Sequence, residues 1–339
     1  MAAISCSCLK IEPIHNDERE EEIRLTSVVC TKGYDPITTD NMDEFGVFAS
    51  FEEDSDFNSS TPMANYIFNE LYYKKEDGSW SWRTQQYWPM KGKLSFFAYT
   101  PYIEGLEMEN IDGRPAIPFT PLKDVTRQQD FCVSEPALNC KKTLEPIPLS
   151  FRHALSHVRF CVNYKGVLPQ PEYYVKIDKI TIEGVIGAKN MIFSNSEPYV
   201  LWEYDEDSKR NDSYTLTRKP VNEVADIEIP IRNESNDNHV EINPLEGRLF
   251  LVPQTINPSA AKINITYGFY ITAQTSEKLM SLFEVEHPLP ESEWKANTIT
   301  NYTMTLDVGK CSLLDLKYSF DSWIEPWKNA SQTDPIPIE

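Results

Sequence analysis

Few residues in this chain have a spacing that could support metal binding. His153 and His157 lie four residues apart, which on a helix would place two imidazoles on one face, where they could bind a metal ion. The segment around them enters a strand, and the sequence offers no third ligand near them. The acidic runs at 52–54 and 205–207 lack the spacing of a calcium-binding loop and suit solvated turns. The sequence therefore predicts no metal site.

Catalytic motifs are also missing from the sequence. No G-x-S-x-G, H-E-x-x-H, P-loop or G-x-G-x-x-G motif occurs, and spacing proposes no Ser/His/Asp or Cys/His set. The net charge of −20 opposes binding to nucleic acid, because phosphate contacts need clustered lysine and arginine. We therefore expect neither an enzyme, nor a cofactor, nor a nucleic-acid partner.

Two cysteines near the amino end could carry a lipid. Cys6 and Cys8 follow small residues, as the acylated cysteine of a bacterial lipoprotein does, although a charged and an apolar leader region are missing before them. A cysteine pair with no role is the alternative interpretation. The acidic stretch at 12–22 would form an extended spacer, because its like charges repel one another. The remaining cysteines are scattered, without C-x-x-C pairs, and suit small buried hydrophobic positions: Cys30, Cys132, Cys140, Cys161 and Cys311.

Tryptophans are the remaining candidates for a binding surface. Trp80 and Trp82 lie in an aromatic cluster, and Trp202 lies in a second one. Flat indole faces can contact sugars, whereas cross-strand aromatic pairs stabilise sheets by roughly 0.2–1 kcal/mol each. Both interpretations stay open, and packing is the commoner one.

The elements that would position these residues are strands. Period-2 alternation recurs along the chain with turn residues between the runs, whereas helical periodicity is nearly absent apart from a short candidate at 276–282. Pro146 and Pro148 should mark a domain boundary, because proline is excluded from central strands. We predict an all-β chain with two tandem β-sandwich domains of transthyretin-like or Greek-key type and few short helices. The divisions are an amino-terminal spacer at 1–22, domains at 23–143 and 144–325, and a tail at 326–339. No run of 18 apolar residues predicts a membrane-spanning helix.

The first predicted strand is a removable element. Ile23, Leu25, Ser27 and Val29 share one face, and a long polar loop follows them. Without this strand, the first sandwich would expose unpaired backbone groups and an apolar row, which could accept a strand from another chain.

Several segments resemble the fimbrillin family of Bacteroides-type bacteria, whose members are two-domain surface lipoproteins that polymerise into fimbriae. The segments occur in the family's order and read FGVFASF, ANYIFNELYYKKEDGSWSWRTQQYWPMKGKLSFFAYTPY, QDFCVSEP, PLSFRHALSHVRFCV and NYTMTLDVGKCSLLDLKYSFDSW. The resemblance implies two β-sandwich domains, an acylated precursor carried to the outer membrane and cell surface, and polymerisation with other fimbrial subunits.

The resemblance also implies a trigger, which is a proteolytic cut after a basic residue in the loop behind the first strand. Here that loop reads VVCTKGYDP, with Lys32 where the family typically has arginine; Arg24 is an earlier alternative. The cut would free a groove for a neighbour's donor strand. Two other functions remain open. One is a glycan-binding outer-membrane surface lipoprotein, and the other is a secreted hydrolase, which would need two carboxylates in a cleft.

Overall fold

A computed structural model describes residues 21–29, 37–165, 173–187, 190–204, 212–218, 240–241, 245–246, 248–273, 276–307 and 317–326. All regular elements in these residues are β-strands, which confirms the predicted all-β class. The helix expected at 276–282 is wrong, since these residues belong to a 13-residue strand. None of the described residues forms a helix long and apolar enough to span a membrane.

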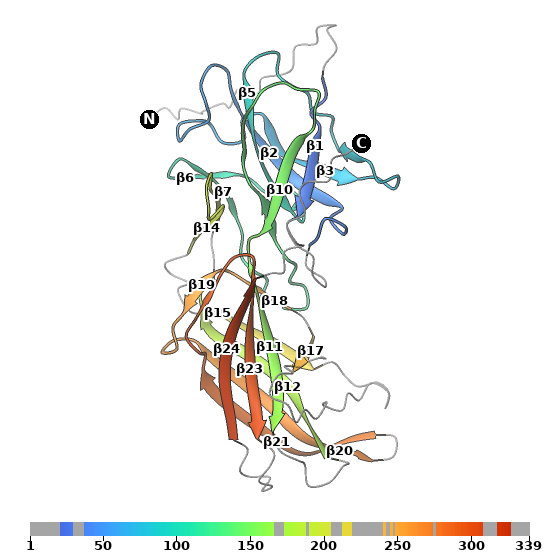
Figure 1. Ribbon diagram of the computed structural model, residues 1–339, viewed down its shortest axis with the longest axis vertical. Coiled ribbons are helices and arrows are strands. Elements are labelled where there is room, and N and C mark those ends of the chain that lie inside the picture. The colour runs from blue at the N-terminus through green and yellow to red at the C-terminus, as the bar shows by residue number, and fades with distance from the viewer. Residues whose placement is uncertain are drawn as a thin grey trace, which may run out of the picture.

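The strands form two lobes that follow one another along the long axis of the molecule (Figure 1). The upper lobe contains a large sheet with the order β1-β10-β8-β5-β2-β3-β4, and β9 pairs with β5. The bounds of its strands are β1 Leu25–Val29, β2 Glu44–Glu52, β3 Ile67–Lys74, β4 Trp80–Trp82, β5 Lys93–Thr100, β8 Cys132–Ser134, β9 Ala137–Cys140 and β10 Ile147–His153.

A second sheet of the upper lobe packs on one face of the first. Its order is β14-β13-β7-β6, with bounds β6 Glu109–Ile111, β7 Arg114–Pro118, β13 Asn190–Phe193 and β14 Val200–Glu203. Phe48 and Phe97 of the large sheet share a buried cluster with Ile117, Met191 and Phe193 of the small one. The opposite face of the large sheet surrounds a separate apolar cluster, which includes Phe45 and Phe96.

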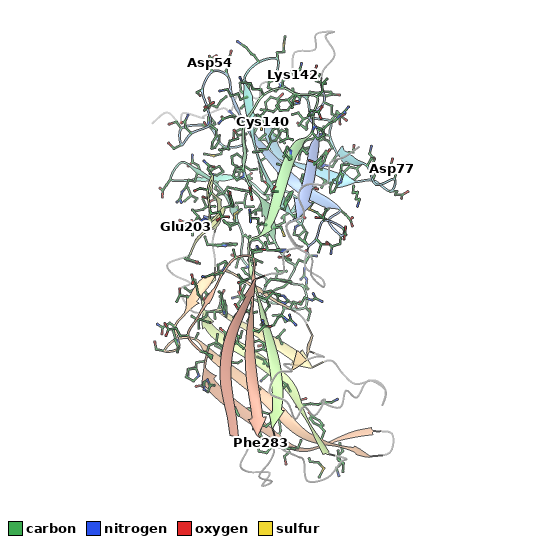
Figure 2. All side chains as sticks on the ribbon, in the orientation of Figure 1. Asp54, Asp77, Cys140, Lys142, Glu203 and Phe283 are labelled. Atoms are coloured by element: carbon green, nitrogen blue, oxygen red, sulfur yellow. The ribbon has the colours of Figure 1, made fainter. Side chains whose placement is uncertain are left out.

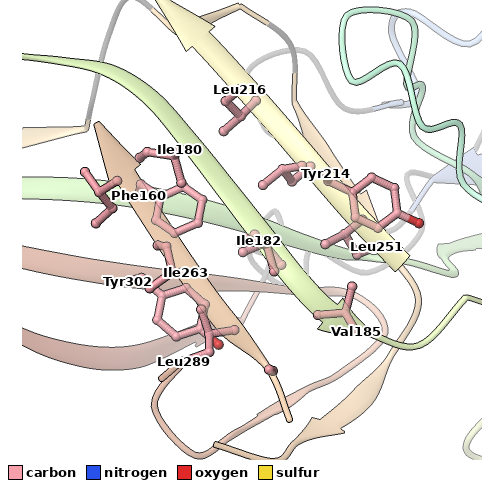
Figure 3. Packing of buried hydrophobic residues seen from close by; sticks show 14 of the residues in the cluster. Phe160, Ile180, Ile182, Val185, Tyr214, Leu216, Leu251, Ile263, Leu289 and Tyr302 are labelled. Carbon is pink, nitrogen blue, oxygen red and sulfur yellow. The ribbon is translucent and has the colours of Figure 1, made fainter. Parts of the chain in front are cut away.

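The lower lobe is a sandwich of two five-stranded sheets and a small strand pair. One sheet has the order β16-β11-β23-β24 with β18 beside β11, the other has the order β17-β15-β12-β20-β21, and β19 pairs with β22. The bounds are β11 Ser156–Lys165, β12 Tyr173–Val185, β15 Asp212–Arg218, β16 Val240–Glu241, β17 Leu245–Glu246, β18 Leu249–Leu251, β19 Gln254–Ile256, β20 Lys262–Ala273, β21 Ser276–Pro288, β22 Ser292–Trp294, β23 Thr298–Asp307 and β24 Lys317–Pro326. Phe160, Ile182, Tyr214, Ile263 and Tyr302 meet in its core (Figure 3).

The strand pairing departs from the boundary expected between residues 143 and 144. β10 follows that point in the sequence, yet it pairs with β1 and β8 of the upper lobe, and β13 pairs with β7. Pro148 lies inside β10 at no cost to the ladder. Pro148 pairs with Thr26 of β1, but the N–H that faces β1 there belongs to Ile147, so the position of the missing N–H faces the other side. On that side β8 pairs only with Phe151 to His153, and no described strand opposite Pro148 accepts a hydrogen bond from it. The chain first passes from the upper lobe to the lower lobe between His153 and Ser156, where Ala154 and Leu155 are buried.

Gly184 lies at a shift in the pairing register of β12 with β15, between Glu183 and Val185. Its φ is +73°, and a Cβ there would lie 2.1 Å from the carbonyl oxygen of Ala260. Gly184→Ala should therefore lower the free energy of unfolding by more than the about 1–3 kcal/mol that positive φ alone costs a residue with a side chain. Gly105 has the same φ of +73° with open space around it, so Gly105→Ala isolates the backbone cost. Urea unfolding of both variants measures the difference, and equal losses would contradict the steric argument.

Candidate functional site: the closing strand β1

The segment at 21–29 joins the two edges of the large upper sheet. β1 and β4 stand at opposite ends of the strand order, so a flat sheet would keep them far apart. Instead, the Tyr72 hydroxyl of β3 lies 3.4 Å from the backbone nitrogen and 3.3 Å from the backbone oxygen of Leu25. The indole Nε1 of Trp82 in β4 donates to the carbonyl oxygen of Ile23 at 2.7 Å. The sheet is thus rolled up, and β1 with the residues just before it closes the roll.

Backbone hydrogen bonds hold this segment on both sides. Toward β10, Leu25 to Val29 run parallel to Ile147 to Phe151, and the Ile147 N–H donates to the Arg24 carbonyl oxygen at 2.9 Å. Toward the other edge, the Ile23 N–H donates to the Gln86 carbonyl oxygen at 2.9 Å. One short segment is therefore hydrogen-bonded to β10 on one side and to the connection between β4 and β5 on the other.

Alternation of side chains explains why the segment lies in this position. Ile23 is fully buried and Leu25 is 3% exposed, whereas Arg24 between them faces solvent. Both apolar side chains belong to the cluster inside the roll, together with aromatic residues from β2, β3, β4 and β10: Phe45, Tyr72, Trp82 and Phe151. Burial of two such side chains contributes about 3–6 kcal/mol to docking of the segment.

Tyr72 is the polar contact in the middle of this apolar interior. Burial raises the pKa of its phenol above the ordinary value, and the hydrogen bond with the Leu25 backbone offsets part of this shift. The phenol is therefore protonated at neutral pH and can donate to the Leu25 carbonyl oxygen. Its ring stacks on Trp80, with the two centroids 5.7 Å apart. The aromatic wall of β3 and β4 thus holds β1 by packing and by hydrogen bonds together.

The structure brings together some of the residues predicted to act at this strand. Ile23 and Leu25 share the interior, and Ser27 is half-buried. Val29 pairs with Phe151 through the backbone, and its side chain is outside the described part. Arg24 is exposed, whereas Lys32, Cys6 and Cys8 lie outside the described residues.

The three tryptophans proposed as surface aromatics are all engaged in packing. Trp82 is 3% exposed, and Trp80 is half-buried against Tyr72 and Phe45. Trp202 is half-buried in β14, and its Nε1 donates to the Ala154 carbonyl oxygen at 3.1 Å. These contacts favour the packing interpretation over a flat sugar-binding face.

A polar group at the end of the interior was missed in the sequence. Asp130, Cys132 and His153 are buried together, with the Asp130 Oδ2 2.5 Å and the Cys132 Sγ 3.3 Å from the His153 Nδ1. The only sequence signal was the i, i+2 spacing of Asp130 and Cys132. His153 joins them because it pairs with Cys132 across the β10–β8 ladder, which no local pattern reveals. His157, which lies four residues after His153 in the sequence, is not part of this group.

His157 gives a pH-dependent prediction. It packs on Phe250, with ring centroids 4.8 Å apart, and burial together with the charge of Arg159 lowers its pKa to about 4. His153 nearby acts in the same direction, and Asp130 opposes it. An unfolded histidine titrates near ~6.5. Between about pH 6.5 and 4, unfolding should therefore be accompanied by uptake of a proton at His157. The contribution of neutral His157 to the free energy of unfolding is fully present above this range and is lost as the pH falls through it. The loss should approach about 3 kcal/mol at pH 4.

Urea unfolding between pH 7 and 4 measures this effect. His157→Gln removes the titrating ring, so the variant should lose less stability on acidification than the original chain. Parallel pH profiles for the two proteins would contradict the assignment, because the remaining carboxylates are common to both.

Comparison with known proteins finds one matching family and several similar folds. A family model described as fimbrillin-like matches residues 31–327. The fold is similar to that of a fimbrial protein from Bacteroides vulgatus, with a TM-score of 0.64 and 16% identity, covering 90% of this chain and 99% of that one. A candidate cell adhesion protein from Bacteroides ovatus has a TM-score of 0.49 and 14% identity, over 92% of this chain and 99% of its own. No curated protein matches the chain. At 16% identity, the likeness to the Bacteroides vulgatus protein shows a shared fold.

Proposed function

The chain belongs to the fimbrillin-like family, and we propose that it is a structural and adhesive subunit of a bacterial cell-surface fimbria. The family membership confirms the resemblance predicted from the sequence. The subunit would polymerise with other fimbrial subunits, and no catalytic step is required of the chain itself. The observation that carries this proposal is the place of β1 as the element that closes a rolled sheet.

We further propose that proteolysis after the first strand releases β1 and opens the roll. The loss of residues 21–29 would leave several groups without their partners, including the Ile147 N–H, the Trp82 Nε1 and the Tyr72 hydroxyl. It would also uncover the apolar row of β10, which contains Ile147, Leu149 and Phe151. A strand from a neighbouring subunit could satisfy the same hydrogen bonds and fill the same row, which is donor-strand exchange.

The matched family region begins at residue 31, two residues after β1 ends at Val29. Lys32 lies at this junction in the sequence, which makes it the proposed processing site, with Arg24 as the earlier alternative. Arg24 is the weaker candidate, because its backbone oxygen is bonded to Ile147 inside the ladder.

Before processing, the proposed precursor is an outer-membrane lipoprotein. Acylation of Cys6 or Cys8 would tether it, and the acidic stretch at 12–22 would act as a spacer between membrane and folded lobes. Removal of the segment before Gly33 would separate the subunit from its lipid in the same step that opens the roll.

Limited trypsin digestion of the purified chain tests this proposal. We expect a product that begins at Gly33 and then forms an SDS-resistant ladder in unboiled gel samples. Lys32→Ala should block both the product and the ladder, whereas Arg24→Ala should leave both in place. A chain that is cut at Lys32 and stays monomeric would refute strand exchange. A ladder formed by the original chain with its amino end intact would refute processing at this site.

A further inference from the structure

The buried group of Asp130, Cys132 and His153 has the composition of a transition-metal site. It offers one carboxylate oxygen, one thiol sulfur and one imidazole nitrogen, and these three atoms lie within 4.8 Å of one another. Zinc is bound in proteins by these three donor types. The side chains of His153 and Asp130 are 0% and 1% exposed, and Cys132 is 0% exposed.

Strand geometry aims the three donors at one point. Asp130 and Cys132 are separated by one residue, so they face the same side, while Phe131 between them packs in the cluster on the opposite face. His153 is the last residue of the inward row of β10 and lies opposite Cys132 in the antiparallel pairing with β8. Cys132 and His153 therefore come from two adjacent strands whose relative position the ladder fixes, and Asp130 lies two residues before β8.

The distances suit a small tetrahedral ion after a modest shift of one group. Zinc–ligand bonds of ~2.0–2.3 Å at tetrahedral angles separate the donor atoms by about 3.3–3.6 Å. The Cys132 Sγ lies 3.3 Å from the His153 Nδ1 and 3.7 Å from the Asp130 Oδ2, which is close to this range. The oxygen and the nitrogen lie 2.5 Å apart, so the carboxylate would withdraw by somewhat less than about 1 Å to admit the ion.

Backbone groups already orient the carboxylate from outside the site. The Phe131 N–H donates to the Asp130 Oδ1 at 2.8 Å, and the Ile37 N–H donates to the Oδ2 at 3.0 Å. Such outer contacts are a regular part of protein metal sites, where they fix ligand orientation. The Ile37 contact also joins the segment that follows the first strand in the sequence to the same carboxylate.

We propose that Asp130, Cys132 and His153 bind a Zn²⁺ ion, with a water molecule in the fourth position. The Cys132 thiol would lose its proton on binding. The ion would join β8 to β10 and, through Asp130, hold Ile37. It would thus hold β10, the strand that pairs with β1, in place whether or not β1 is exchanged. This proposal does not depend on the proposed fimbrial function, because binding can be measured on the monomer.

Titration of the metal-free full chain with Co²⁺ tests the proposal. Cobalt commonly occupies zinc sites and gives a thiolate charge-transfer band in the near ultraviolet when sulfur is a ligand. We expect this band to saturate at one equivalent and to disappear when Zn²⁺ displaces the cobalt. Cys132→Ser should abolish the band. Cys140→Ser is the matched control: Cys140 lies outside the group, in β9 of the same lobe (Figure 2), and its loss should leave the band unchanged.

One measurement on the original chain decides the outcome even if a variant fails to fold. Zn²⁺ should raise the melting temperature of the original chain, because a ligand that binds only the folded state stabilises it. His153→Gln should weaken Zn²⁺ binding by about 100-fold or more, since even changes outside the first ligands cost ~10–100-fold. A folded original chain that binds no stoichiometric Co²⁺ or Zn²⁺ would overturn the proposal, and the group would then be an internal hydrogen-bonded network only. A cobalt band that survives in folded Cys132→Ser would likewise overturn it.

Discussion

A chain carrying Leu25→Asp should form SDS-resistant ladders without any protease. Leu25 is 3% exposed inside the rolled sheet, and its neighbours there are aliphatic and aromatic side chains. An aspartate at this place would be an uncompensated buried charge, which costs on the order of 3–5 kcal/mol. The cost is comparable with the apolar contribution of the whole segment, so the strand should undock. Since ~1.4 kcal/mol corresponds to a tenfold change in an equilibrium constant, we expect the undocked population to rise more than about 100-fold.

Hydrogen exchange and gel electrophoresis together measure this result. The amides of β1 should lose protection, whereas those of the central strands β2 and β5 should keep it, because β1 stands at the edge of the sheet. Arg24→Asp is the matched control. It introduces the same carboxylate one residue earlier, at an exposed position, and should leave the chain monomeric. A Leu25→Asp chain that exchanges its β1 amides rapidly and still forms no ladder would show that release of β1 is insufficient for assembly.

Local sequence patterns predicted those parts of the fold that depend on local alternation. Ile23 and Leu25 were placed on one face because the residue between them is polar, and the structure buries both and exposes Arg24. The all-β class followed from the same period-2 pattern. In contrast, the segment at 276–282 contains good helix formers and lacks β-branched residues, and it becomes a strand because β21 pairs along nearly its whole length with β20. Pairing with a long neighbour outweighs a weak local preference.

Features that depend on strands far apart in the sequence were not predicted. The hairpin of β13 and β14 pairs with β7 in the upper lobe, although the chain has already entered the lower lobe. The rolled sheet is closed by Tyr72 and Trp82, whose partners lie 47 and 59 residues earlier. The contact between Cys132 and His153 has the same origin. Alternation shows which side chains face inward, but it does not say which strand comes to lie opposite.

Phe45→Ala should cause the largest loss of stability in the upper lobe. Phe45 is fully buried in β2, and its ring centroid lies 5.2 Å from those of Tyr72, Trp80 and Phe151. Truncation would remove contacts to β3, β4 and β10 at once, and those strands cannot close over the space because their own hydrogen bonds fix them. We expect the free energy of unfolding to fall by about 3–5 kcal/mol, as found for buried phenylalanines generally.

Docking of β1 should also be weaker in this variant, because Phe45 packs in the same cluster as Ile23 and Leu25. Faster exchange of the β1 amides should therefore accompany the lower unfolding midpoint in urea. Phe68→Ala provides the control, since Phe68 lies on β3 with 63% of its surface exposed and its truncation should change stability by less than about 0.5 kcal/mol. Similar losses in the two variants would mean that Phe45 does not organise the interior. If Phe45→Ala keeps its stability but exchanges its β1 amides faster, then docking of β1 contributes little to the free energy of unfolding of the lobe.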